Sequence, residues 1–160
     1  MPIISNTSPV LNLAIIGRLD LLKLQFGTVF IPQAVLQELR LEEDLPGTPA
    51  IRQAIDSGWL VVQGITNVPL VQALKRELDA GESEAIALAL EQSADWVLLD
   101  EREGRRVAKT FGLNVVGIIG VLLRAEKQSQ IEAFEQEITA LKTQAGFWIN
   151  PALLADIRKR

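Results

Sequence analysis

Short apolar runs alternate with longer segments of helical periodicity along most of the chain. The apolar runs are typical of buried strands, and they cover residues 3–5, 28–31, 59–62, 96–99 and 113–116. The periodic segments predict helices over residues 10–22 with a break near Gly17, after Pro32 with Val35, Leu36 and Leu39 on the apolar face, and over 51–55, 69–78, 82–91, 102–111, 117–127, 131–141 and 151–160. Strands that alternate with helices indicate an α/β domain with a mainly parallel sheet of about five strands, covered on both faces.

Helix caps and breaks refine this pattern. Ser8 is a good capping residue and Pro9 suits a first helical position, so we expect the first helix to begin there. Asp79-Ala80-Gly81 predicts a break just before the strongly apolar helix over 82–91. A length of 160 residues fits one domain, and residues 128–160 form a C-terminal helical extension of it.

Composition narrows the chemistry that the chain can perform. The sequence contains no Cys, His or Tyr, which excludes disulfides, thiolate and imidazole metal sites, and Ser-His-Asp catalysis. The net charge of −4 argues against a chain that binds nucleic acid by its overall charge, although a local basic patch stays possible. No apolar run is long enough to span a bilayer, and the N-terminus lacks signal-peptide features, so we expect a cytoplasmic protein.

Polar side chains directly follow two of the predicted strands. Asn6 comes after the first strand, and Asp100 and Glu101 come after the fourth. In open parallel sheets, sites form outside the carboxyl ends of the strands, so these residues are candidates for a common site. The structural alternatives are a local turn closed by the Asn6 side chain and a helix capped by Asp100.

Three further acids lie on predicted helices. Glu38 is at the edge of the apolar face of the Pro32 helix, and an isolated helical Glu is usually just solvated. Glu82 and Glu84 open the helix after Gly81, where the helix dipole alone is a sufficient explanation for them. Together with the strand-end residues they predict a site for a hard cation, since Mg²⁺ and Mn²⁺ prefer oxygen ligands and need neither His nor Cys.

The order of these motifs resembles that of PIN domains, the family of metal-dependent nucleases that includes VapC-type toxins, and more closely the prokaryotic branch with an SNTSPL-type start. The segments that carry the resemblance are 4–10, 31–39, 81–89, 98–108 and 117–123, so it extends over about residues 3–127. It implies a three-layer α/β/α sandwich and a cluster of acids that binds Mg²⁺ or Mn²⁺ for cleavage of single-stranded RNA.

The resemblance also implies roles for individual residues. Carried over by position, Asn6 stands where most active members have Asp, Glu38 takes the second acidic position and Asp100 the fourth, with Glu101 beside it. Glu84 best matches the third position, because Ala85 and Ala89 follow it, and Glu82 competes with it. Arg102 and Arg105 are candidates for contacts with the RNA backbone.

Two hypotheses follow from this reading. The first is a metal-dependent ribonuclease, the toxin of a toxin–antitoxin pair, with an antitoxin protein as partner and a homodimeric assembly by analogy. The second is a catalytically weak or inactive PIN-like module that binds a protein or RNA, because the neutral Asn6 lowers the attraction for a divalent ion. A phospho-acceptor receiver domain is disfavoured, since Lys109 lies inside a predicted helix and not at a strand end.

Overall fold

A single parallel sheet forms the centre of the molecule in the computed structural model, which describes residues 2–159. Its five strands in this part of the chain are β1 (Ile3–Ser5), β2 (Val29–Ile31), β3 (Leu60–Val62), β4 (Trp96–Leu98) and β5 (Val115–Val116). They lie in the order β3-β2-β1-β4-β5, and each neighbouring pair is parallel. The predicted strands are therefore confirmed, with boundaries shifted by at most two residues.

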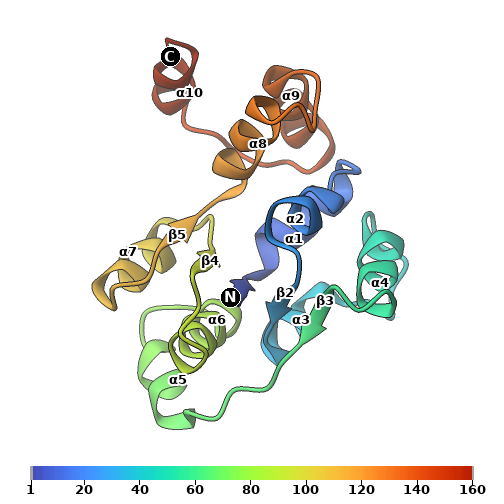
Figure 1. Ribbon diagram of the computed structural model, residues 1–160. Helices are drawn as coiled ribbons and strands as arrows, with labels where there is room; N and C mark the ends of the chain where they lie inside the picture. The colour runs from blue at the N-terminus through green and yellow to red at the C-terminus, as the bar shows by residue number, and fades with distance from the viewer. Residues whose placement is uncertain (1, 160) are drawn as a thin grey trace.

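Helices connect all the strands and flank the sheet (Figure 1). They are α1 (Thr7–Ile15), α2 (Asp20–Phe26), α3 (Gln33–Leu39), α4 (Thr48–Asp56), α5 (Val68–Leu74), α6 (Ala80–Glu91), α7 (Arg102–Thr110), α8 (Ile118–Lys127), α9 (Phe134–Gln144) and α10 (Pro151–Arg158). None of the helices within residues 2–159 is both long and apolar enough to cross a bilayer.

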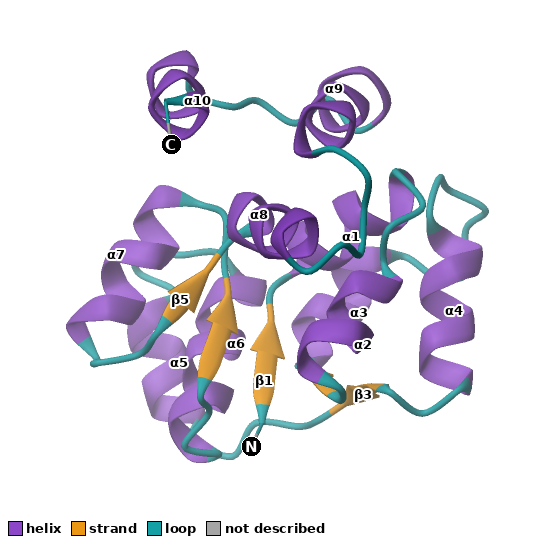
Figure 2. Cartoon of the chain, turned by 45° about the horizontal axis from the view of Figure 1, so that its top comes forward, coloured by secondary structure: helices purple, strands orange, loops and turns teal. Residues whose placement is uncertain are grey.

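Successive residues of each strand point to opposite faces of the sheet, and this alternation creates two apolar layers. On one face, Ile3 and Leu98 pack with α1, α2, α4, α8 and α9. On the other face, Ile4 and Val97 pack with α5, α6 and α7. Burial on both faces explains why the strands are apolar without polar alternation, and it confirms the three-layer α/β/α sandwich (Figure 2).

The strand order places the ends of β1 and β4 side by side. The chain builds β1, β2 and β3 outward in one direction and then crosses to the other side of β1 to form β4 and β5. The Asn6 N–H donates to the Leu98 carbonyl oxygen at 3.0 Å, so the pairing continues to the last residues of both strands. This is the point where the direction of winding reverses, and the crevice at such a point is where α/β sheets bind ligands.

Two helix starts differ from the predicted ones. α1 begins at Thr7 with Asn6 as its N-cap residue, so Ser8 lies inside the first turn and does not cap it. α6 begins at Ala80, because the Asp79 side chain accepts a hydrogen bond from the Glu82 N–H in a capping box. Gly81 is therefore helical, and the predicted break falls earlier, at Asp79.

A partly buried ion pair joins the C-terminal helices to the rest of the domain. The Arg18 guanidinium, in the turn between α1 and α2, donates to both Glu137 carboxylate oxygens of α9, at 2.7 and 3.2 Å. The Glu137 side chain is only 8% exposed, whereas Arg18 is 39% exposed. Removing the cation would leave a buried carboxylate without its charged partner.

We expect Arg18→Ala to lower the free energy of unfolding by about 1–2 kcal/mol, the low end for a charged hydrogen-bonded group because Arg18 is partly solvated. Arg158→Ala is the matched control, since Arg158 pairs with Glu135 in solvent. Urea denaturation of both variants measures the difference. An equal loss in the two proteins would contradict the anchoring role of Arg18.

Candidate active site

Asn6 ends β1 with a buried side chain that is 4% exposed. Its backbone has the extended conformation of an N-cap residue, but its side chain makes no capping hydrogen bond. The amide oxygen, Oδ1, is buried and has no hydrogen-bond partner among the described residues. The Asn6 oxygen therefore does not close a local turn, and an unpaired buried acceptor of this kind is costly unless something binds it.

Glu38 brings its carboxylate from the last turn of α3 to the same place. Its Oε1 accepts a hydrogen bond from the Gly81 N–H at 3.1 Å, and its Oε2 accepts one from the Thr7 hydroxyl. A Cβ atom at position 81 would lie 2.5 Å from Glu38 Oε2 and 2.9 Å from Asn6 Oδ1. These two oxygen atoms thus lie around one point beside α6, and the absence of a side chain at Gly81 leaves room for them.

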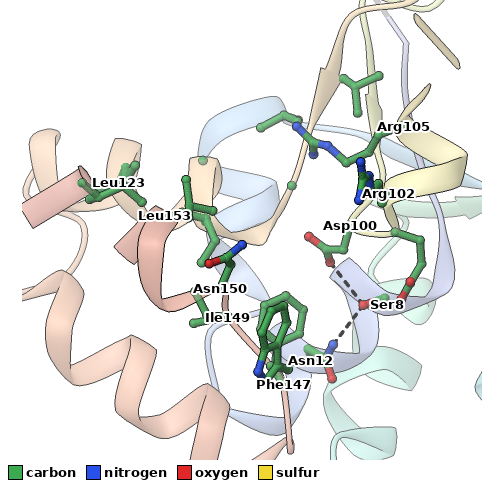
Figure 3. A pocket seen from close by; sticks show the side chains of 18 of the residues that line it. Ser8, Asn12, Asp100, Arg102, Arg105, Leu123, Phe147, Ile149, Asn150 and Leu153 are labelled. Carbon is green, nitrogen blue, oxygen red and sulfur yellow. Dashed lines mark hydrogen bonds between the residues drawn. The ribbon is translucent and has the colours of Figure 1, made fainter. Parts of the chain in front are cut away.

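Asp100 is fixed at the end of β4 by two hydrogen bonds. Its Oδ1 accepts from the Ile118 N–H at 2.8 Å. Its Oδ2 accepts from the Ser8 hydroxyl at 3.1 Å, the bond drawn in Figure 3. The carboxylate thus caps α8 and not the adjacent α7, where the capping alternative had placed it. Burial raises the pKa of Asp100, and the two hydrogen bonds counter part of that rise.

Glu82 is buried at the start of α6. Its Oε1 accepts from the Asp79 N–H at 3.3 Å, while its Oε2 has no hydrogen-bond partner in the described chain. A Cβ atom at Gly104 of α7 would lie 2.5 Å from that Oε2, so the two helices are in close contact here. Burial, together with the nearby Asp79 charge, raises the pKa of Glu82 to about 7.

Glu84 lies in a different place from Glu82, although the sequence offers both for the third acidic position. Its Oε1 accepts a hydrogen bond at 3.1 Å from the Ala34 N–H in the first turn of α3. The Glu84 carboxylate thus satisfies one of the unpaired N–H groups at that helix N-terminus and favours its dipole. Glu38 lies at the opposite end of α3 and accepts a hydrogen bond from the Gly81 N–H. Helix α6 therefore contacts the start of α3 through Glu84 and its last turn through Gly81.

A groove of about 1130 Å³ opens beside Asp100. Glu101, Arg102 and Arg105 line it, and Arg105 also donates to the Leu99 carbonyl oxygen at 2.8 Å. The opposite wall comes from residues 145–157, a segment to which the sequence assigned no role. Asn6, Glu38 and Glu82 do not line this groove, whose acidic lining residues are Asp100, Glu101 and Asp156.

The donor chemistry fits a hard divalent cation. Asn6 and Glu38 present oxygen atoms around one point, and β1–β4 pairing places Asp100 at the neighbouring strand end. Within residues 2–159, no group of three or more acidic side chains is close enough together to hold a metal ion. At this edge, Asn6, Glu38 and Asp100 are the residues that could supply oxygen ligands to such an ion.

A family model described as a PIN domain matches residues 2–160. The chain belongs to the PIN-domain family. A solved structure with the same fold is that of a PilT N-terminus domain protein from the hyperthermophilic archaeon Sulfolobus solfataricus P2, at a TM-score of 0.58 and 20% identity, over 78% of this chain and 93% of that one. No curated protein matches the sequence. PIN domains are generally nucleases that bind nucleic acid, which gives this site its class of chemistry.

Three residues of this PIN domain support the acids and were not identified as such from the sequence. Thr7 holds Glu38, Ser8 holds Asp100, and Gly81 makes room for Asn6 and Glu38. The sequence itself predicts a helix cap at Ser8 and a helix break that includes Gly81, and it indicates no individual role for Thr7. Their positions in the sequence could have indicated these roles, since Thr7 and Ser8 directly follow Asn6 and Gly81 directly precedes Glu82.

The raised pKa of Glu82 predicts how the stability of the metal-free PIN domain depends on pH. The unfolded chain loses this proton near pH 4.5 and the folded chain only near pH 7, so unfolding releases a proton between these values. Stability therefore falls as the pH rises from about 4.5 to 7. In Glu82→Gln, which cannot ionise, the fall should be smaller when measured by urea denaturation in EDTA.

Glu42→Gln, at an exposed loop position, is the matched control and should keep the native pH dependence. The raised pKa of Asp100 also makes stability fall with rising pH, but it does so equally in the native protein, Glu82→Gln and Glu42→Gln. The difference between these proteins therefore isolates the contribution of Glu82. A native protein that gains stability over this pH range relative to Glu82→Gln would contradict the assignment.

Proposed function

We propose that this PIN domain is a metal-dependent ribonuclease that cleaves phosphodiester bonds of single-stranded RNA. The observation that carries the proposal is the buried, unpaired Oδ1 of Asn6 beside the Glu38 carboxylate, at the strand edge that also bears Asp100. Asn6, Glu38 and Asp100 would hold Mg²⁺ or Mn²⁺. When bound, such an ion supplies Lewis-acid stabilisation of the charge that develops on the phosphate.

The chain's own residues prepare the site for that chemistry. Thr7 and the Gly81 N–H fix the Glu38 carboxylate, and Ser8 and the Ile118 N–H fix Asp100. Preorganised oxygen atoms pay no reorganisation cost when a ligand arrives, which favours tight and correctly oriented binding.

The third acidic position is better assigned to Glu82 than to Glu84. Glu82 is buried between α6 and α7 with one unpaired carboxylate oxygen, whereas Glu84 is engaged by the start of α3. We therefore propose that Glu82 influences the site by its charge, whereas Glu84 holds α3 against α6. Glu101, at the rim of the groove, is an outer candidate for the ion.

The biological role that we propose is that of a cytoplasmic toxin in a toxin–antitoxin pair. Its support is the resemblance to VapC-type toxins over about residues 3–127. An antitoxin protein would be the partner, and homodimerisation is proposed by the same analogy.

Replacing Glu38 is the direct test of the ribonuclease. Glu38→Gln keeps the shape and removes the charge: its amide oxygen can still accept from the Gly81 N–H, while its NH₂ group would donate to the Thr7 hydroxyl in place of accepting from it. We expect cleavage of a single-stranded RNA panel with Mn²⁺ to fall by about 100-fold or more. Asp100→Asn should show a loss of the same order. Gel analysis of end-labelled RNA measures both.

Glu84→Gln is the matched control, because its amide oxygen can still accept from the Ala34 N–H. We expect it to retain most of the native rate. Metal-independent cleavage that is equal in the native, Glu38→Gln and Asp100→Asn proteins would overturn the proposal.

A catalytically weak module that binds a protein or RNA is the second candidate function. The observation that favours it is Asn6 itself, since a neutral amide gives the site one negative charge fewer than a carboxylate would. Both Asp100 oxygens also already accept hydrogen bonds, which lowers their basicity toward a cation.

Asn6→Asp separates the two candidates. A carboxylate at this buried position lies beside Glu38, so we expect the metal-free variant to be less stable and its Mn²⁺ affinity to rise about tenfold or more over the native protein. Calorimetric titration with Mn²⁺ and thermal melting with and without it measure the two effects. Micromolar binding of Mn²⁺ by the native protein would count against the weak module.

A further inference from the structure

The second wall of the groove beside Asp100 is the least explained part of the molecule. We name residues 145–157, which contain the link from α9 and most of α10, the C-terminal arm. Figure 3 shows Phe147, Ile149, Asn150 and Leu153 of the arm facing the same space as Asp100, Arg102 and Arg105. A groove bordered by a proposed catalytic acid on one side thus has a mixed aromatic and aliphatic surface on the other.

Apolar side chains anchor the arm to the core. Ile149 and Leu154 are buried in the larger core, and Phe147 packs against it, half-buried. Trp148, between Phe147 and Ile149, also lines the groove and is 74% exposed. The indole is therefore exposed on a backbone that the core holds.

The opposite wall is cationic although the chain as a whole has a net charge of −4. Arg102, Arg105 and Lys109 of α7 line the groove, and Arg102 and Lys109 are exposed without an ion pair to any residue from 2 to 159. Arg106, by contrast, is paired with Glu77 and Glu103. The acids that line the groove are Asp100, Glu101 and Asp156, so α7 is the element that concentrates its cations. The exposed Arg102 and Lys109, together with an exposed aromatic ring, are complementary to a polyanion with flat, apolar bases.

We propose that the groove is a subsite for single-stranded RNA, in which one unstacked base lies against Trp148 while Arg102 and Lys109 contact phosphates. Aromatic platforms combined with basic grooves bind single strands in this way, because every base has a stacking face. The subsite rests on the proposed ribonuclease function and adds to it the side chains that position the strand at Asp100.

The test is binding of a fluorescent eight-nucleotide RNA in EDTA, which prevents metal-dependent cleavage, measured by anisotropy. We expect Trp148→Ala to weaken binding about tenfold, within the range for loss of one stacked base, and Trp148→Phe to restore most of it. Trp96→Ala is the matched control, since Trp96 is a partly exposed Trp at the start of β4 and does not line the groove. Its affinity should stay within about twofold of native. Equal affinities of Trp148→Ala and Trp96→Ala would overturn the subsite.

An RNA of the same length without bases separates stacking from a structural effect of the arm. The native protein should bind it about as weakly as Trp148→Ala binds intact RNA, and Trp148→Ala should bring no further loss. Further weakening on the abasic strand would show that the variant damages the groove itself, and it would overturn the stacking role. Arg102→Ala and Lys109→Ala should each lower the dependence of affinity on salt by about one ion, with or without bases.

The outcome is distinguishable from that of the ribonuclease proposal. RNA binding that depends on Trp148 in a protein without nuclease activity supports the subsite and overturns only the catalytic assignment. Nuclease activity together with unchanged RNA binding by Trp148→Ala supports the ribonuclease and overturns only the subsite. A dimer that dissociates in Trp148→Ala during sedimentation, with RNA affinity unchanged, would identify a second copy of the chain as the occupant and overturn the subsite.

Discussion

The close approach of α6 to the ends of β1 and α3 is the contact on which the site depends. At Gly81 a single added carbon atom would overlap the Glu38 carboxylate and press on the Asn6 amide oxygen. Because no side chain is present, the Gly81 N–H can donate to Glu38 Oε1. The Glu38 Oε2 and Asn6 Oδ1 atoms can also lie close to this one point. The same helix reaches the other end of α3 through Glu84, so polar contacts at both ends fix α3 against α6. The position of the Glu38 carboxylate is therefore set by backbone packing and does not rely on side-chain rotamers alone.

The acids at this strand edge have structural as well as chemical consequences. Asp100 caps α8 and binds the first turn of α1, and Glu38 joins α1 to α6 through Thr7 and Gly81. Their substitution therefore affects folding as well as any proposed function, and isosteric amides separate the two effects better than alanine does. Burial also raises the pKa of Glu82 and Asp100, which shows that the folded chain tolerates these charges at a cost to its stability.

Much of this architecture could be predicted from the sequence, because buried parallel strands and their intervening helices have distinct apolar periods. The strand ends likewise predicted Asn6 and Asp100 as neighbours. The sequence could not show which of Glu82 and Glu84 suits the third acidic position. Two residues this far apart on one helix point more than half a turn away from each other, and only the position of α3 shows that Glu84 contacts its first turn. Ser8 was wrongly interpreted as a cap because its partner, Asp100, is distant in sequence. The C-terminal arm was missed for a related reason, since its only signal is the exposure of Trp148, which depends on burial of its neighbours.

The arm follows, in chain order, every element that carries an acid of the site. The protein thus divides into an early part that fixes the Glu38 and Asp100 carboxylates and a late part that borders the groove beside Asp100. Substitutions at exposed positions such as Trp148 and Leu153 leave the hydrogen bonds of Glu38 and Asp100 untouched. Under the proposed function, changes in the arm would alter which strands are admitted while the contacts of Glu38 and Asp100 stay the same, so related chains could diverge in target and keep one chemistry.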